Sequence, residues 1–346
     1  MQMIDRSPKL HTTKATLHLV NIALCLLALL PLKTKAQQQV YPTSFTVAKD
    51  GSGDFKTIQE AVNAVRNFSQ QQVTIHVKPG IYAEKVVVSE IRTNVYLKGE
   101  NPETTIITNG DYSGKMLPVA EQKPGQEKYS TFNSYTVLVK GNDFKAENLT
   151  IINSAGPVGQ AVALHVEADR CTIINCRLLG NQDTLYTGND TSRQYYQNCW
   201  IEGTTDFIFG AATVVFQNCT LKSRANSYIT AASTTTRQPY GYVFLNCNLI
   251  ADSAATKVYL GRPWRPHARV VFIGCKMDKH ILPAGWHNWG NAENEKTAFY
   301  AEYNNTGPGA AIDQRVSWSR QLSRKDAGAY TFDHIFNRLD GWVPAN

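Results

Sequence analysis

Only one stretch of the 346-residue sequence is apolar enough to interact with a membrane, and it lies near the beginning. This stretch, residues 17–32, follows two lysines and precedes Thr34-Lys35-Ala36, which supplies the small residues of a cleavage site. Its apolar core is shorter than a membrane span requires. We therefore expect residues 1–36 to be a secretory signal peptide rather than a membrane anchor. Residues 37–346 would then be one domain that is exported, either secreted or periplasmic, and free of the membrane.

The sequence also lacks a large excess of charge of one sign. It has 35 basic and 28 acidic side chains, a net charge of +7, and residues 1–36 hold +4 of that total. The remaining +3, and the lack of basic runs with interleaved aromatic residues, give no support to a nucleic-acid partner. This mild excess is compatible with a polyanionic partner.

Two common kinds of hydrolytic site are missing from the sequence. No window fits the G-x-S-x-G nucleophile elbow of a serine hydrolase, because Gly110-Asp-Tyr-Ser-Gly114 is misspaced. The eight histidines are scattered and show no paired ligand spacing, so we expect no metal site.

The six cysteines after residue 36 do not have the context of a disulfide framework. Five of them lie in copies or variants of an N-C-x-[LI] pattern, at Cys176, Cys199, Cys219, Cys247 and Cys275. Spacings of 23, 20, 28 and 28 residues, with short β-type runs before most copies, are typical of a solenoid. We expect the cysteines to stack as reduced core residues and their asparagines to form a hydrogen-bonded ladder at a turn. A single disulfide between neighbouring coils is the alternative.

Helical periodicity is missing between these β-type runs, which favours an all-β fold, the right-handed parallel β-helix. Residues 54–68 are an exception, because four of their apolar residues share one helical face. We expect this segment to be a helix that caps the N-terminal end. Beyond about Gly285 the repeat fades, and we expect a C-terminal cap with loops. No Pro- or Ser-rich linker divides the chain, which predicts one domain.

Polar side chains recur at the same interval as the coils. Gln160 and Gln182 are 22 residues apart, and Asp183 and Asp206 are 23 apart. Arg262 follows Asp206 by 56 residues, which would be two coils of 28. Residues one coil apart stack in a β-helix, so we expect these five side chains to lie close together.

Such a cluster would explain Asp206, whose carboxylate opens an apolar run and would be costly to bury alone. Arg262 can pair with Asp206 and keep its pKa low, while Asp183, beside a second carboxylate, should have a raised pKa. One ionised and one protonated carboxylate suit a nucleophile and a general acid, and glutamine amides can stabilise an oxyanion. The alternative is a polar ladder with a buried ion pair and no catalytic role.

Five short motifs resemble those of the pectin methylesterase family of carbohydrate esterases: GIYAE (80–84), QAVAL (160–164), QDTLY (182–186), DFIFG (206–210) and LGRPW (260–264). Each motif alone is weak evidence, but five in the family's order and spacing are specific. The resemblance extends over residues 43–343. It implies a right-handed parallel β-helix, a pectin (homogalacturonan) substrate, and no metal or organic cofactor.

The resemblance also implies a role for each residue of the cluster. Asp206 would attack the methyl ester carbonyl of galacturonate. Asp183 would protonate the departing methanol and then take a proton from water. Gln182 and Gln160 would stabilise the oxyanion, and Arg262 would position Asp206.

Four further positions match substrate-binding residues of the family, namely Trp264, Tyr186, Phe209 and Thr131. Trp264 would stack on a sugar ring, whereas Tyr186 and Phe209 could line the cleft or simply pack. His165 departs from the family's pattern, because plant members usually have arginine there. This departure affects the rim of the cleft rather than the chemistry.

Two other functions fit the same fold. A pectate lyase or a polygalacturonase would need a calcium-binding acidic cluster with a basic catalyst, or several clustered aspartates, whereas only Asp183 and Asp206 are expected to stack. A non-catalytic polysaccharide-binding solenoid would need none of these groups. We expect an esterase that acts on pectin as a monomer.

Overall fold

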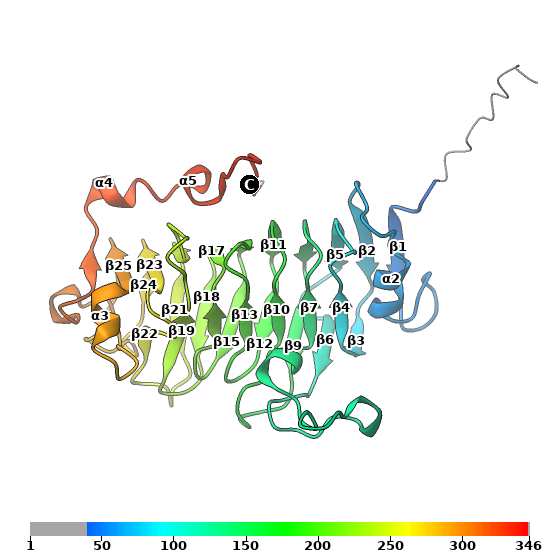
Figure 1. The fold of residues 1–346 in the computed structure, drawn as a ribbon, viewed down its shortest axis with the longest axis horizontal. Coiled ribbons are helices and arrows are strands. Elements are labelled where there is room, and N and C mark those ends of the chain that lie inside the picture. Colours follow the sequence, from blue (N-terminus) through cyan, green and yellow to red (C-terminus); the bar gives the residue numbers. More distant parts are fainter. Residues whose placement is uncertain (1–39, 345–346) are drawn as a thin grey trace, which may run out of the picture. The chain divides into compact units, whose positions relative to one another are not determined.

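The computed structural model describes residues 40–344. The predicted signal peptide, residues 1–36, lies outside the described residues, so its assignment stays a prediction. From residue 42 the described chain forms one unit, and it is the predicted right-handed parallel β-helix (Figure 1). Within residues 40–344, no helix combines the length and the apolar character that a membrane span requires.

Three parallel sheets form the walls of the β-helix, and we call them sheets A, B and C. Sheet A contains β1 (Ser44–Val47), β2 (Val73–Val77), β5 (Val95–Gly99), β8 (Lys145–Glu147), β11 (Cys171–Ile174), β14 (Arg193–Gln197), β17 (Thr213–Gln217), β20 (Tyr242–Leu245), β23 (Arg269–Ile273), β25 (Phe299–Tyr303) and β26 (Arg320–Gln321). Sheet B contains β3 (Gly80–Ala83), β6 (Thr105–Asn109), β9 (Thr150–Asn153), β12 (Arg177–Leu179), β15 (Trp200–Gly203), β18 (Thr220–Ser223), β21 (Asn248–Ala251) and β24 (Lys276–Met277). Sheet C contains β4 (Val86–Val88), β7 (Val137–Val139), β10 (Leu164–Val166), β13 (Leu185–Thr187), β16 (Ile208–Gly210), β19 (Tyr228–Ala232) and β22 (Tyr259–Pro263).

Like side chains stack inside the β-helix because each coil pairs in register with the next. One aromatic row runs through Tyr196, Phe216, Phe244 and Phe272, with ring centroids 5.0, 4.6 and 4.3 Å apart. The five repeat cysteines and Cys171 are buried, and all six are free thiols in the described chain. Their predicted place in the core is confirmed, and they pack as small apolar residues.

The asparagines of the repeat do not form the predicted ladder of side chains. Asn175, Asn198, Asn218 and Asn246 have exposed side chains, and each occupies a two-residue turn between sheets A and B with φ between 52° and 55°. Their backbone N–H groups make the ladder instead, each donating to a carbonyl of the next coil at 2.9–3.0 Å. Asparagine recurs because it tolerates the left-handed conformation that the turn requires.

The predicted N-terminal cap helix is present but shorter than expected. Helix α2 (Ile58–Ala64) begins with a capping box between Thr57 and Glu60 and buries Ile58, Ala61 and Val62 against the first coils. It ends at Val65, whose backbone is extended. The flanking residues of 54–68 share its apolar spacing without being helical.

The far end differs from the prediction in two ways. The repeat does not stop near Gly285, because β25 adds another strand to sheet A beyond α3 (Glu293–Thr297). The segment that follows covers the open core with Val316 and Trp318, as a cap should. The last residues then turn back along the outer face of sheet A as α4 (Arg324–Ala327) and α5 (Phe332–Phe336) (Figure 1).

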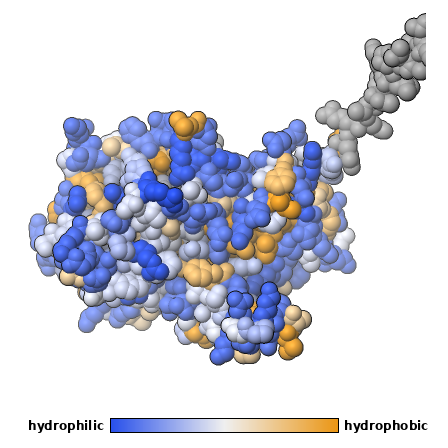
Figure 2. Space-filling view, viewed as in Figure 1, coloured by the Kyte–Doolittle hydropathy of each residue, from blue (hydrophilic) through white to orange (hydrophobic). Residues whose placement is uncertain are grey.

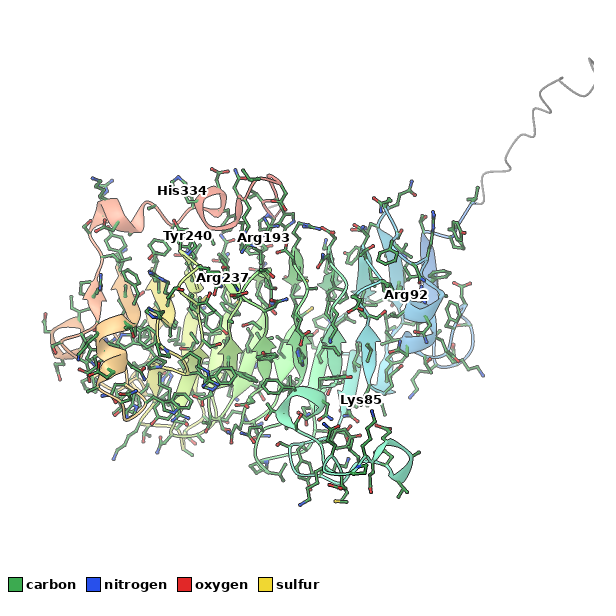
Figure 3. All side chains as sticks on the ribbon, in the orientation of Figure 1. Lys85, Arg92, Arg193, Arg237, Tyr240 and His334 are labelled. Carbon is green, nitrogen blue, oxygen red and sulfur yellow. The ribbon has the colours of Figure 1, made fainter. Side chains whose placement is uncertain are left out.

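This C-terminal tail covers an apolar strip on the outside of sheet A. Phe336 and Ile335 pack on Tyr195, Val215 and Val243 of β14, β17 and β20. Arg193, labelled in Figure 3 on the sheet below the tail, pairs with Asp340 at 2.5 Å and with Asp169 at 2.6 Å. Its other guanidinium nitrogen donates to the carbonyl of Phe336 at 2.8 Å. The tail is thus held by both apolar burial and a shared ion pair.

Candidate active site

A cleft of about 410 Å³ lies on the outer face of sheet C. Its lining residues come from several coils and the loops between them: Thr131, Phe132, Gln160, Gln182, Asp183, Asp206, Phe209, Ala231, Arg262, Trp264 and Trp289. All five residues of the predicted polar cluster are in this list. The spacing argument therefore identified one real site.

The β-pairing explains why these residues meet. Gln160 pairs with Gln182 in a parallel bridge one coil apart. Asp183 and Asp206 both have left-handed backbones, with φ of 66° and 49°, just before β13 and β16. The backbone N–H of Asp183 donates to the carbonyl of Thr205, and that of Asp206 to the carbonyl of Tyr228. Both carboxylates are therefore presented at the same turn of successive coils.

Arg262 reaches the cluster from a different register than predicted. It lies two strands from Asp206, but its backbone pairs with Ala231 and, through it, with Phe209. Those two steps are 22 and 31 residues long, not 28 each. Gly261 allows the close approach of β22 to β19, because a Cβ there would lie 1.9 Å from the hydroxyl of Thr230.

Asp206 and Arg262 form a bidentate ion pair. The Nε of Arg262 donates to Oδ1 of Asp206 at 3.0 Å, and Nη2 donates to Oδ2 at 2.7 Å. The Asp206 side chain is 8% exposed and that of Arg262 is 20% exposed. A planar guanidinium in this position fixes the orientation of the carboxylate as well as compensating its charge.

The two carboxyl groups differ in what surrounds them. Burial and the charge of Asp206 raise the pKa of Asp183 to about 8, against a smaller opposing effect of Arg262. Burial also raises the pKa of Asp206 above its ordinary value, although the hydrogen bonds and charge of Arg262 oppose the rise. The predicted low pKa of Asp206 is therefore wrong, because desolvation outweighs the ion pair. The predicted rise at Asp183 is confirmed.

Aromatic residues form one wall of the cleft. The rings of Tyr186 and Phe209 are 4.7 Å apart, and Phe209 is 5.9 Å from Trp264. Phe132, beside Thr131, packs edge-on against Tyr186 at 5.3 Å. Of the four predicted substrate-binding residues, Thr131, Phe209 and Trp264 line the cavity. Tyr186 supports the wall from behind.

No group of three or more His, Cys, Asp or Glu side chains within residues 40–344 is arranged to hold a metal ion. The arrangement is instead one of two carboxyl groups, one guanidinium and two amides beside an aromatic wall. The Pectinesterase family model matches residues 44–338 of the chain.

The chain belongs to the pectinesterase family. It is therefore a carboxylic ester hydrolase. Pectinesterase 31 of Arabidopsis thaliana is 41% identical over 286 residues, which are 82% of this chain and 89% of that protein. Some curated relatives are longer, and this pectinesterase spans about half (53%) of a probable pectinesterase/pectinesterase inhibitor of the same plant, at 40% identity over 86% of its own length.

Solved structures agree with this assignment. Pectin methylesterase from carrot is 36% identical, with a TM-score of 0.78 over 86% of this chain and 94% of the carrot chain. A pectin methylesterase in complex with a hexasaccharide is 31% identical, with a TM-score of 0.74 over 89% of this chain and 99% of that one.

Sequence reasoning missed several residues of this pectinesterase cleft. Trp289 lies in the irregular segment before α3, which the sequence suggested to be only cap and loops. Phe132 directly follows Thr131, and the sequence offers no signal for it beyond that neighbour. Ala231 could have been found from strand pairing, because it lies between Phe209 and Arg262 in sheet C.

A long excursion between β6 and β7, residues 110–136, brings Thr131 and Phe132 to the cleft. It is the loop below sheet C in Figure 1, and Figure 2 shows hydrophobic residues on its surface, where Met116 and Val119 are exposed. Lys85, labelled in Figure 3, lies at its base. The excursion is thus the part of the cleft with the least support from the coils.

Lys85 fastens this excursion to sheet C. Its ammonium donates to Asp111 at 3.0 Å and to the carbonyl of Asn133 at 2.7 Å. It also lies 4.6 Å from the ring centroids of both Tyr129 and Tyr135. Hydrogen bonds from lysines lower the pKa of the buried Asp111 to about 2, so this carboxylate is ionised throughout the working pH range.

His165, the departure from the family's pattern, lies in the same sheet row as Tyr186 and Phe209. It is buried, its Nε2 is 2.8 Å from Glu167, and its ring meets Tyr186 edge-on at 4.5 Å. Its role here is to support the aromatic wall, and it does not line the cavity itself.

Proposed function

We propose that this chain hydrolyses the methyl esters of galacturonate in pectin, with Asp206 as nucleophile and Asp183 as general acid and base. One observation carries the proposal. Two buried carboxyl groups face the same cleft, and only Asp206 is held by a bidentate guanidinium. Such an environment favours the ionised form of Asp206 over that of Asp183, which separates a nucleophile from an acid.

In the first half of the reaction a carboxylate oxygen of Asp206 attacks the ester carbonyl. The C–O bond to methoxide breaks as the tetrahedral intermediate collapses, and Asp183 gives its proton to the leaving oxygen. The products are methanol and an anhydride between Asp206 and the galacturonate carbonyl. The pKa of about 8 keeps Asp183 protonated at neutral pH, as this step requires.

In the second half Asp183 is a carboxylate and takes a proton from water. The resulting hydroxide attacks the galacturonate carbonyl of the anhydride, and the bond to Asp206 breaks. Free galacturonate and ionised Asp206 are produced, and Asp183 carries the proton again. The protons balance over the cycle because the same residue gives and receives one.

Gln160 and Gln182 are the groups in the cleft that can donate to an oxyanion. Both are amides, both are half-buried, and they lie one coil apart. An amide N–H₂ aimed at the carbonyl oxygen would stabilise the charge that develops in each tetrahedral intermediate. Trp264 and Phe209 offer apolar faces on which the sugar rings can stack, and Thr131 offers a hydroxyl.

Methylated pectin tests the proposal against its rivals. We expect purified protein to release methanol and acidify the solution. A lyase would produce unsaturated ends, a polygalacturonase would produce reducing ends, and a binding module would produce neither. A folded preparation that releases no methanol would overturn the proposed function.

We also propose that the protein is exported and acts as a monomer. The support is the signal-like pattern of residues 1–36 and the polysaccharide nature of the substrate. Sequencing the N-terminus of the mature protein should find a start near Gln37 outside the cytoplasm. Light scattering during gel filtration should give the mass of a single chain.

A further inference from the structure

The guanidinium of Arg262 lies between two aromatic rings. Its Cζ is 4.0 Å from the ring centroid of Tyr228 and 3.7 Å from that of Trp289. Trp289 lines the cavity, whereas Tyr228 is not among the described residues that do. A cation stacked on both faces can move only within its own plane, which is the plane that contains the bonds to Asp206.

Tyr228 also holds the other partner of the ion pair. Its backbone carbonyl accepts the N–H of Asp206 at 2.8 Å. Asp206 has a left-handed backbone with φ of 49°, a conformation that costs energy in a non-glycine residue unless neighbours fix it. One residue therefore contacts the main chain of Asp206 and the side chain of Arg262.

The ring of Tyr228 is itself supported. It stacks on Tyr259 of the next coil, with centroids 5.3 Å apart and planes 16° from parallel. His287 meets both rings edge-on, at 5.4 and 5.3 Å. The N–H of Trp289 donates to Nδ1 of His287 at 3.0 Å, so the second ring over Arg262 is tied to the same group.

We propose that Tyr228 is a positioning residue for ester hydrolysis, which holds Arg262 with its ring and Asp206 with its carbonyl. The inference rests on the proposed function of Asp206 as nucleophile. Tyr228 acts through these two residues and does not touch the reacting ester. Its ring, rather than its hydroxyl, is the part that matters, because the guanidinium faces the ring.

The ionisation of Asp206 reports on this positioning. The titratable and charged groups around it are Asp183 before β13, Arg262 on β22, Tyr300 on β25, and His287 beyond Arg262. Only Arg262 favours the carboxylate form among these. An Arg262 that is free to swing away should therefore require a higher pH to ionise Asp206, and the acid limb of kcat/KM should move upward.

The test compares Tyr228→Leu with Tyr228→Phe and with the natural protein, by methanol release from methylated oligogalacturonides across pH. We expect Tyr228→Phe to behave like the natural protein. We expect Tyr228→Leu to lose about tenfold in kcat with little change in KM, and its acid limb to rise by about one pH unit. If Tyr228→Leu fails to fold, Tyr228→Met removes the ring while keeping most of the volume.

Two results would overturn the proposal while leaving the proposed function intact. One is a folded, ringless variant with unchanged kcat and acid limb. The other is an equal loss in Tyr228→Phe, which would assign the effect to the hydroxyl. Natural protein without methanol release would instead overturn the proposed function itself, so the two failures are distinguishable.

Discussion

Asp183 and Asp206 occupy equivalent positions on successive coils, and both adopt a left-handed backbone directly before a strand of sheet C. Each N–H donates to a carbonyl of the following coil, at 3.1 Å for Asp183 and 2.8 Å for Asp206. The two carboxyl groups are thus repeats of one local structure. Their different chemistry comes from what faces them, chiefly the ion pair of Arg262 with Asp206.

Replacing either aspartate with asparagine should abolish most activity. Asp206→Asn removes the nucleophile and Asp183→Asn removes the transferable proton, so kcat for methanol release should fall by about 10³-fold or more in each. Circular dichroism should show both variants folded. Asp252→Asn, which changes a partly exposed carboxylate in a surface ion pair with Lys222, is the matched control and should keep full activity. Near-natural turnover in Asp206→Asn would remove this residue as nucleophile.

Arg262→Ala should destabilise the protein as well as inactivate it. It leaves Asp206 buried without a cation, and we expect a loss of about 2–4 kcal/mol in the free energy of unfolding at pH 7. Protonation of Asp206 relieves this cost, so the loss should be smaller at pH 4. Urea unfolding at the two pH values measures both effects.

The double variant Asp206→Asn/Arg262→Ala provides the control for that experiment. It removes both charges, so it should regain much of the stability that Arg262→Ala loses. Equal stability of the double and the single variant would show that the unpaired carboxylate is not the cause.

The protonated carboxyl of Asp183 should make the folded state less stable as pH rises. Its pKa is about 8 in the folded protein against an ordinary 3.8, so between these values the folded state binds more protons than the unfolded state. The free energy of unfolding should then fall with pH, by at most about 1.4 kcal/mol per unit from this group. Asp183→Asn should lack this slope and be more stable than the natural protein near pH 8. Parallel pH profiles of unfolding for the two proteins would contradict the assignment.

Lys85→Met should weaken substrate binding more than catalysis. The change removes the ammonium that joins Asp111, Asn133 and two tyrosine rings, so the excursion with Thr131 and Phe132 should become less ordered. We expect KM to rise about three- to tenfold and kcat to change little. Lys78→Met, at an exposed pair with Glu100, should leave both constants as they are. A fall in kcat at constant KM would argue against this role of Lys85.

Much of the site could be predicted from spacing because a β-helix converts sequence interval into spatial neighbourhood. Gln160, Gln182, Asp183 and Asp206 are one coil apart in pairs, and these coils have similar lengths. The register of Arg262 could not be found in this way, because the loops around β19 give successive coils of 22 and 31 residues. Its long side chain covers the difference.

Other features depend on quantities that the sequence does not contain. The direction of the pKa shift at Asp206 depends on how deeply the carboxylate is buried relative to the strength of its ion pair. The contacts of Tyr228 and Trp289 with Arg262 come from two loops of unrelated sequence that meet only in the folded protein. The return of the C-terminal tail along sheet A depends on an apolar strip that is spread over three coils.

The asparagine turns have a consequence for how this chain can change. From β8 onward, the corner between sheets A and B is always a two-residue turn, as between β11 and β12 or β20 and β21. The segments that lead into sheet C vary instead, from four residues before β16 to 27 before β7. Insertions and deletions are therefore confined to the loops that carry Thr131, Gln160 and Asp183 to the cleft. The fold keeps one edge constant and leaves the substrate-facing edge open to evolutionary remodelling.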